Sequence, residues 1–348
     1  MLKKCTIASL FVLMVFAMHI GNIELATPLA LAPMAGITDK PFRMLCRRFG
    51  AGLASSEMTT SDPSLQNTRK TLQRADHSGE TGIRSVQIVG NIPEVMAEAA
   101  KLNVARGAQI IDINMGCPAK KVCNVLAGSA LLKDEALVQD ILQAVVQSVD
   151  VPVTLKTRLG WDDAHLNVPT IAKIAVDAGI QTLAIHGRSR TQMYTGEARY
   201  ELIAQVKREL PIPLWVNGDI TTAAKALQVL EQTGADGAMV GRGAQGQPWI
   251  FRDIKHMLEH GVLPEALAFQ EAASVVLEHL AAIHAFYGEH GVKIARKHLL
   301  WYLGGFDAYQ RERTEINQIQ ETSLQYEKIA DLLEQLSHQY DLWPRRVA

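Results

Sequence analysis

Eight short apolar runs recur at nearly even intervals along the chain, and helix-like segments separate most of them. The runs are Leu29–Met34, Leu53–Glu57, Ser85–Val89, Ile110–Asn114, Val153–Lys156, Thr182–His186, Leu214–Asn217 and Ala238–Gly241. The helix-like segments include Pro93–Ala105, Glu135–Ser148, Val168–Ala178, Tyr200–Glu209 and Thr222–Gln232. Continuous apolar runs are typical of strands buried on both faces, as in a parallel sheet. Eight strand–helix units over roughly 220 residues predict an α/β fold, a (β/α)8 TIM barrel. A doubly wound sheet, which normally has fewer strands, is the alternative fold.

The pattern changes after Trp249. From about Phe269 to the C-terminus the sequence predicts helices, over Gln270–Tyr287, Val292–Leu303 and Thr314–Gln335. Gly261 and Pro264 indicate a linker near residues 260–266. We therefore expect a catalytic barrel domain over residues 18–260, followed by a small C-terminal all-helical domain over residues 267–348.

The first seventeen residues do not fit this plan. Lys3 and Lys4 precede an apolar run over residues 7–17, which resembles the charged start and apolar core of a signal peptide. Met18 is followed at once by a short hairpin pattern with Gly21-Asn22 at its turn. We expect Met18 to be the natural start and residues 1–17 to be a leader-like extension outside the fold. An export signal or membrane anchor is the alternative.

Bulk composition limits the class of protein without naming it. The chain has 348 residues, 48% of them hydrophobic and 20% charged, with a net charge of −1. Bulk charge therefore gives no indication of a nucleic-acid partner, and any RNA site must be a local basic patch. Four scattered cysteines, with no CxxC pair, favour a reducing compartment and give no indication of a metal site.

Polar residues follow the predicted strands where each strand ends. They are Pro33–Ala35, Glu57, Gln87, Asn114 with Cys117, Lys156, His186, Asn217–Asp219 and Gly241–Arg242. Active sites of barrels form at the carboxyl ends of the strands. These residues therefore predict an active site rather than packing positions.

Cys117 lies between Gly116 and Pro118 in the loop after the fourth predicted strand. Glycine allows close approach of the backbone, and proline stiffens the loop. A cysteine displayed on such a loop indicates chemistry; a small apolar filler is the alternative.

The loops after the last two predicted strands, over residues 217–220 and 241–244, are rich in glycine. Backbone N–H groups at this place in a barrel commonly bind phosphate, and Arg242 adds a fixed charge. No GxGxxG motif opens the chain, so a flavin mononucleotide (FMN) fits better than a Rossmann-bound nicotinamide. Lys156 would face the reduced ring, with Gln87 at its edge and His186 near the ring or the phosphate tail. Glycine turns without a ligand, and a core histidine at position 186, are the alternatives.

Several motifs together resemble those of the tRNA-dihydrouridine synthases. They are residues 33–39 (PMAGITD), 56–58 (SEM), 112–121 (DINMGCPAKK), 126–132 (LAGSALL), 186–188 (HGR), 217–220 (NGDI) and 241–242 (GR). The NMGCPAKK form and residues 246–251 (GQPWIF) are most similar to the bacterial B type. The resemblance runs from about Met18 to near Ile319, and it assigns no role to Cys123.

The resemblance implies reduction of the C5–C6 bond of a D-loop uridine in tRNA, with FMN as cofactor and NADPH (or NADH) as reductant. Reduced FMN would give hydride to C6, and Cys117 would give a proton to C5. The FMN contacts that it implies are Pro33, Met34, Ala35, Gln87, Lys156, His186, Asn217, Gly218, Asp219, Gly241 and Arg242.

The RNA partner calls for a pocket that receives a flipped base and for positive charge around its mouth. We expect Asn114 to contact the uracil edge. The expected rim cations are Lys120, Lys121, Arg158, Arg188 and Arg190, and those of the helical tail are Lys293, Arg296 and Lys297. The last three share one helical face, which as a bare pattern also fits a solvated helix.

The expected partners are tRNA and NADPH, with no membrane partner; we expect a monomer in the cytoplasm. Two other functions are compatible with parts of the pattern. One is an FMN barrel dehydrogenase of the dihydropyrimidine or dihydroorotate type, acting on a free base. The other is a non-catalytic RNA-binding barrel.

Overall fold

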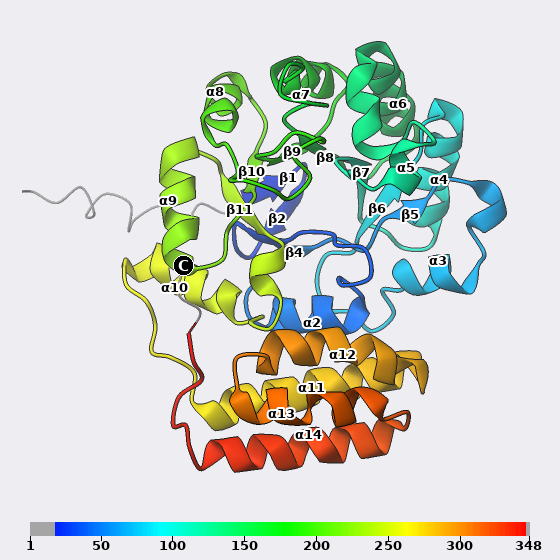
Figure 1. Cartoon of the computed structure of the whole chain (residues 1–348). Helices are drawn as coiled ribbons and strands as arrows, with labels where there is room; N and C mark the ends of the chain where they lie inside the picture. The colour runs from blue at the N-terminus through cyan, green and yellow to red at the C-terminus, as the bar shows by residue number, and fades with distance from the viewer. Residues whose placement is uncertain (1–17, 346–348) are drawn as a thin grey trace, which may run out of the picture.

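Apolar runs buried on both faces form one curled parallel sheet, and helices cover its outer side (Figure 1). The computed structural model describes residues 18–345, so the predicted leader over residues 1–17 lies outside the described residues. The strand order is β4-β3-β11-β10-β9-β8-β7-β6-β5. The strands are β3 (Leu29–Leu31), β4 (Leu53–Ala54), β5 (Thr59–Thr60), β6 (Ser85–Val89), β7 (Ile110–Met115), β8 (Val153–Arg158), β9 (Thr182–His186), β10 (Leu214–Asn217) and β11 (Gly237–Val240). The predicted eight-stranded barrel is therefore confirmed, with its second strand in two pieces.

The second strand differs from the predicted single run over Leu53–Glu57. Its first piece, β4, pairs with β3, and its second piece, β5, pairs with β6. Between them, Ser55 forms a bridge to Ser85, and the Ser56 hydroxyl accepts a hydrogen bond from the Gln87 backbone N–H at 3.1 Å. The Ser56 hydroxyl thus takes the place of a backbone acceptor between two pieces that pair with different neighbours. The first strand also ends earlier than predicted, at Leu31, just before Pro33, which has no N–H to donate.

The covering helices follow from capped, amphipathic sequence. In α6, Val138, Ile141, Leu142 and Val145 form one buried face, and the Asp134 carboxylate accepts a hydrogen bond from the Leu137 N–H at 3.0 Å at the N-cap. The helices of this domain are α2 (Lys40–Arg48), α3 (Arg69–Arg74), α4 (Pro93–Ala105), α5 (Lys120–Cys123), α6 (Glu135–Ser148), α7 (Val168–Asp177), α8 (Glu201–Glu209), α9 (Ala223–Thr233) and α10 (Ile250–His260). Short 3-10 turns lie at η1 (Pro63–Leu65), η2 (Gly128–Lys133) and η3 (Arg242–Ala244).

The predicted N-terminal hairpin is present as β1 (Met18–Ile20) and β2 (Ile23–Leu25). Gly21 at its turn has a φ of +59°, a left-handed conformation that glycine adopts without strain. Ile20 and Leu25 are buried together with Trp215 and Met239 of the sheet. The hairpin therefore packs directly onto the barrel strands.

Four helices form a second layer below the barrel, in orange and red in Figure 1: α11 (Phe269–Tyr287), α12 (His290–Leu303), α13 (Asp307–Gln318) and α14 (Thr322–Ser337). The prediction of a single helix over Thr314–Gln335 is wrong, because the chain turns between α13 and α14. Ile319 takes an extended conformation there, and its carbonyl accepts a hydrogen bond from Arg296 at 3.1 Å. Within residues 18–345, no helix combines the length and apolar character that a membrane crossing requires.

The two layers meet at an aromatic cluster around Trp249. Its ring lies 6.3 Å from Phe49 of the barrel layer, 6.2 Å from Tyr302 of α12 and 5.8 Å from Trp343, measured between ring centroids.

We expect Trp249→Ala to lower the free energy of unfolding by about 3–5 kcal/mol, because it leaves a cavity at a buried site between the two layers. Chemical denaturation measures the loss. Tyr326→Ala, at a partly exposed ring on α14, is the control and should cost far less; equal losses would contradict the packing argument.

Candidate active site

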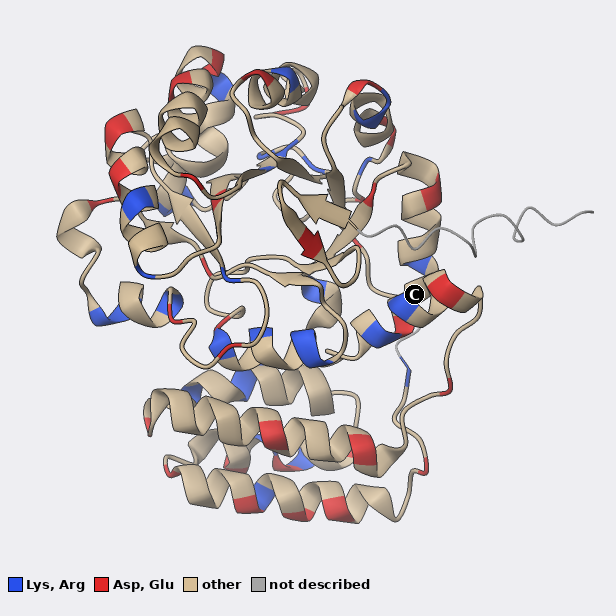
Figure 2. Ribbon diagram, turned by 180° about the vertical axis from the view of Figure 1, so that it is seen from behind, with Lys and Arg blue, Asp and Glu red and all other residues tan. Residues whose placement is uncertain are grey.

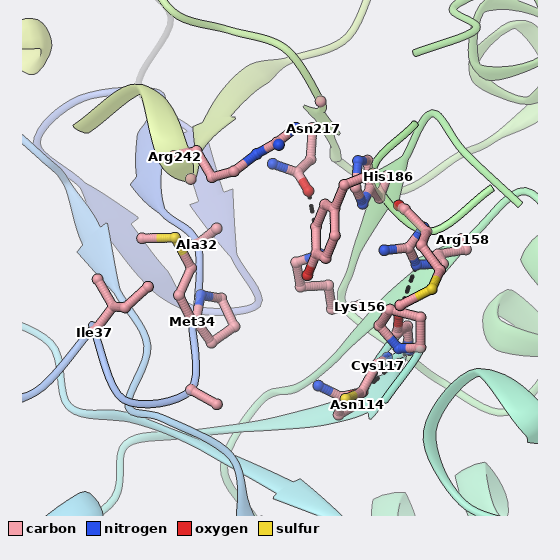
Figure 3. Close-up of a pocket in the computed structure, with 18 of the residues that line it drawn as sticks. Ala32, Met34, Ile37, Asn114, Cys117, Lys156, Arg158, His186, Asn217 and Arg242 are labelled. Carbon is pink, nitrogen blue, oxygen red and sulfur yellow. Dashed lines mark hydrogen bonds between the residues drawn. The ribbon is translucent and has the colours of Figure 1, made fainter. Parts of the chain in front are cut away.

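A cavity of about 820 Å³ opens at the carboxyl ends of the barrel strands (Figure 3). Residues from all parts of the rim line it: Pro33, Met34, Ala35, Gln87, Asn114, Cys117, Lys156, His186, Asn217, Gly218, Asp219, Gly241 and Arg242. The structure therefore brings together every residue predicted to hold the cofactor, with Cys117 and Asn114 beside them. Binding sites of small ligands and cofactors commonly occupy roughly 300–1,000 Å³, so the volume suits a nucleotide cofactor.

Cys117 lies half-buried in the loop that follows β7. Its backbone N–H donates to the Asn114 side-chain oxygen at 2.9 Å, and its carbonyl accepts from the Ser129 hydroxyl at 2.8 Å. These bonds fix the backbone on both sides of the thiol. Burial raises the pKa of the Cys117 thiol, so it stays protonated at neutral pH. The loop thus presents a protonated thiol to the cavity.

A chain of side-chain hydrogen bonds under the loop starts at Asp112, which the sequence analysis did not select. The Gln87 amide N–H donates to Asp112 at 2.6 Å, and the Asn114 amide N–H donates to the Gln87 oxygen at 2.7 Å. Thr154 donates to the second Asp112 oxygen at 2.7 Å. Because an ionised carboxylate only accepts, it sets the orientation of both amides and turns the Asn114 oxygen toward the Cys117 N–H. Burial raises the pKa of Asp112 to about 6, against the lowering effect of these hydrogen bonds.

Lys156 and His186 place one positive and one neutral group in the same wall. The Lys156 ammonium is buried and donates to Asn217 at 3.2 Å. Burial, together with the Arg158 charge, lowers the pKa of Lys156 to about 8. Burial also holds the pKa of His186 well below its usual range, with Arg158 adding to the effect, so its ring is neutral. Arg188 donates to the Nε2 of this ring at 3.3 Å.

The glycines of the last two strand ends form a close-fitting cradle. A Cβ at Gly218 would lie 2.8 Å from the Ala198 Cβ, and one at Gly243 would lie 2.0 Å from the Ile220 carbonyl oxygen. Real Cβ atoms do not approach so closely, so only glycine lets the backbone at these positions pack this tightly against the neighbouring segments beside the cavity. Arg242 is exposed and within 3.4 Å of the Asp219 carboxylate. The cradle, Arg242 and Lys156 fit a ligand that carries a phosphate at one end and gains negative charge at the other.

The β9–α8 connection adds a residue that the sequence analysis missed. Tyr194 lines the cavity, and its ring lies between the guanidinium groups of Arg242, at 4.9 Å, and Arg158, at 5.5 Å. Loops at the carboxyl ends of barrel strands face the site, so an aromatic residue in this loop was a usable signal. Arg158 itself is buried at the end of β8, where it donates to the Gly116 carbonyl at 2.7 Å, rather than lying on a rim loop as expected.

Arg188 also differs from its expected place on the RNA-facing rim. Its side chain is almost fully buried, with a 2.7 Å ion pair to Asp219 and hydrogen bonds to the carbonyls of Thr195 and Gly196. These contacts hold the β9–α8 connection against the cradle. Arg188 therefore has a structural role in this conformation, because its guanidinium does not face solvent.

Some of the cations predicted to bind RNA are exposed, and others donate hydrogen bonds to the protein's own backbone. Lys120 and Lys121 on α5 and Lys293 on α12 are exposed, whereas Arg296 is bonded to the Ile319 carbonyl and Lys297 to the Gly36 carbonyl. Figure 2 shows further basic segments along α3 and α2, at the boundary between the barrel and the helical layer, whereas α10 carries both basic and acidic residues. Arg69 and Lys70 of α3 are exposed there, and the sequence analysis did not select them.

Comparison with known proteins identifies the class. The family model of the dihydrouridine synthases matches residues 30–338, and this chain belongs to that family. It is an oxidoreductase of the flavoprotein type that acts on a carbon–carbon double bond. The likeness is to the B type: tRNA-dihydrouridine synthase B of Pseudomonas aeruginosa is 57% identical over 308 residues, which cover 88% of this chain and 93% of that one.

A second relative extends the comparison. The enzyme of the same name from Xanthomonas axonopodis pv. citri is 60% identical over 288 residues, covering 82% of this chain and 86% of its own length. Among solved structures, a 2-naphthoyl-CoA reductase superimposes with a TM-score of 0.56 at 11% identity, covering 73% of this chain and 53% of that one. At this identity the superposition shows a shared fold alone.

Proposed function

We propose that this chain reduces the C5–C6 double bond of a D-loop uridine in tRNA, with FMN as cofactor and NADPH as reductant. One observation carries the proposal: a protonated thiol, a buried ammonium and a glycine cradle with a fixed arginine line a single cavity. Each part has a use in this reaction. A free-base dehydrogenase would use the same cavity but would need no helical layer to hold a large substrate.

The proposed cofactor contacts follow from the fit described above. The cradle at Gly218, Gly241 and Gly243, with Arg242, would hold the phosphate of FMN through backbone N–H groups and charge. Lys156 would lie against the ring, together with Gln87, His186 and the turn at Pro33–Ala35. When bound, the flavin supplies a hydride for C6 of the uracil.

Cys117 is the proposed general acid. Hydride addition at C6 leaves negative charge across C5 and O4 of the uracil, and a proton must reach C5. The raised pKa of the Cys117 thiol keeps its proton in place at neutral pH, and the fixed loop backbone keeps the sulfur at the cavity wall. In this scheme Asn114 positions the thiol through its oxygen and contacts the uracil edge.

The RNA side of the proposal uses the exposed cations. Lys120 and Lys121 would meet phosphates on the barrel rim, and Lys293 would meet them on the helical domain. The target base would leave its stack to enter the cavity. We expect the protein to act in the cytoplasm, where tRNA is found, and to do so as a monomer.

The proposal is tested with the purified full chain. Extracted cofactor should be FMN, and unmodified tRNA should accelerate NADPH oxidation with one dihydrouridine formed per NADPH consumed. Free uridine and uracil should give no such acceleration. Turnover of the free base alone, or a colourless protein that binds RNA, would support one of the two other functions instead.

The chain of hydrogen bonds from Asp112 through Gln87 to Asn114, called the Asp112 relay below, gives a further prediction. Asp112→Asn replaces two accepting oxygens by one oxygen and one N–H donor, so the Gln87 amide no longer has a charged acceptor and the orientation of Asn114 is less firmly fixed. Dihydrouridine formation per bound flavin should fall about tenfold, equivalent to ~1.4 kcal/mol in the barrier. Thr154→Val removes the bond to the other Asp112 oxygen and leaves the carboxylate as the acceptor for Gln87. It should therefore lower the rate of dihydrouridine formation less than Asp112→Asn does.

The same change should alter the pH profile. As pH falls through about 6, Asp112 takes up a proton and its carboxyl becomes able to donate, so the parent should lose activity on the acid side. Asp112→Asn has no carboxyl to titrate, and this acid limb should disappear. An unchanged acid limb in the variant would remove Asp112 from the relay.

A further inference from the structure

A tight turn over residues 34–38 forms one wall of the cavity. The Met34 carbonyl accepts hydrogen bonds from the N–H groups of Ile37 and Thr38, both at 3.0 Å, and the Met34 N–H donates to the Thr38 hydroxyl at 2.9 Å. Gly36, at the tip, has a φ of +75°. Met34, Ala35 and Ile37 line the cavity, so the position of this turn sets the position of its wall.

Two charged side chains anchor the tip of the turn from opposite sides. The Gly36 N–H donates to the carboxylate of Glu57, which is buried and also pairs with Arg74 at 3.3 Å. The Gly36 carbonyl accepts from the ammonium of Lys297, on α12 of the helical layer. One peptide group on each side of Gly36 is thus held by charge, once from the barrel and once from the helical domain.

Lys297 lies against other protein groups, with only part of its side chain in solvent. Its side chain is half-buried, and burial lowers its pKa while the carboxylates of Asp39 and Glu57 oppose that lowering. Asp39 is the N-cap of α2, a helix of the barrel layer whose Phe42 ring packs against His298 of α12. Lys293, one turn earlier on α12, is exposed. The two lysines share a helix face and differ in what they contact.

We propose that Lys297 is a positioning residue for the cofactor cavity, through which the helical domain holds the turn at Gly36. This inference rests on the proposed function, in which the cavity holds FMN and the helical domain meets tRNA. Lys297 is then not a phosphate contact, which revises its place in the predicted RNA-binding set. Helix α12 carries both Lys293, which would meet RNA, and Lys297, which holds the turn beside the flavin. In this proposal the binding of tRNA and the binding of FMN are therefore coupled through α12. Linkage is reciprocal, so tRNA should change the affinity for FMN and FMN the affinity for tRNA by the same factor.

The test measures FMN affinity directly, without turnover. The full chain is stripped of flavin and titrated with FMN, following the quenching of flavin fluorescence. Lys297→Met, which keeps the apolar stem, should bind FMN about tenfold more weakly, since a charge-assisted hydrogen bond that holds the wall is lost. Lys297→Arg should restore most of the affinity. Lys328→Met, at a partly exposed ion pair on α14 that is far from the turn in sequence, is the control and should bind FMN as the parent does.

The salt dependence of tRNA binding separates the two lysines. Lys293→Met should reduce the slope of log affinity against log salt by about one, as one lost phosphate contact does. Lys297→Met should keep the parent slope, and FMN should no longer change its tRNA affinity as in the parent. Parent-like FMN affinity with a reduced salt slope would overturn the proposal and return Lys297 to the phosphate contacts.

A second variant keeps the test independent of folding. Glu57→Gln weakens the other anchor of the same turn and should also weaken FMN binding, with Lys297 intact. If Lys297→Met melts well below the parent, the result from Glu57→Gln decides, and parent-like FMN affinity there would overturn the proposal. A parent protein that binds no FMN would contradict the proposed function itself, which is a different outcome.

Discussion

Cys117→Ala should lower the rate of dihydrouridine formation in tRNA by roughly 10²–10⁴, the usual contribution of a positioned proton donor. The variant should still bind FMN and still be reduced by NADPH, because the thiol acts after hydride has reached the base. Single-turnover reaction of pre-reduced enzyme with tRNA measures the affected step, and NADPH oxidation without RNA measures the unaffected one.

Cys123→Ala is the matched control for this prediction. Cys123 is the last residue of α5, six positions after Cys117, and it is buried with its sulfur 3.5 Å from the Cys117 carbonyl and 3.6 Å from the Ser129 hydroxyl. Its removal deletes a neighbouring thiol without deleting the proposed acid. Near-normal activity of Cys117→Ala, or an equal loss in both variants, would remove Cys117 from its role.

Lys156→Met should weaken FMN binding or slow flavin reduction by roughly 10–100-fold, because the cation that stabilises negative charge on the reduced ring is gone. Methionine keeps the apolar part of the side chain, so the buried wall stays filled. Flavin content of the purified protein and the rate of its reduction by NADPH give the two readouts.

The matched control is Lys133→Met, at a rim lysine whose ammonium lies 3.7 Å from the centre of the Trp161 ring. This lysine does not line the cavity. Flavin content and reduction should both stay near those of the parent. If Lys156→Met behaved like this control, Lys156 would not lie beside the flavin.

The barrel was predictable because its strands are buried on both faces, and burial on both faces leaves a continuous apolar run in the sequence. What the apolar pattern does not encode is where side chains replace ladder bonds. Between the two pieces of the second strand, the Ser56 hydroxyl accepts from the Gln87 N–H, and this partner is distant in sequence. The turn between α13 and α14 depends in the same way on a tertiary contact, from Arg296 to the Ile319 carbonyl.

The cavity residues were predictable because parallel strands bring their carboxyl ends to one edge. Position in the sequence did not separate side chains that face the cavity from those that support it. Arg188 looks like a rim cation but is buried against Asp219, and Lys297 looks like an RNA contact but reaches Gly36. Asp112 reads as one more residue of a buried strand, and its relay is visible in the packed structure alone.

The most direct measurement is a map of dihydrouridine across the tRNAs of cells that contain or lack this protein. We expect D-loop dihydrouridine to disappear from at least one tRNA position when the protein is absent. The parent chain should restore the modification, and Cys117→Ala should not. An unchanged map, or restoration by Cys117→Ala as complete as that by the parent, would rule out the proposed function or the proposed role of Cys117.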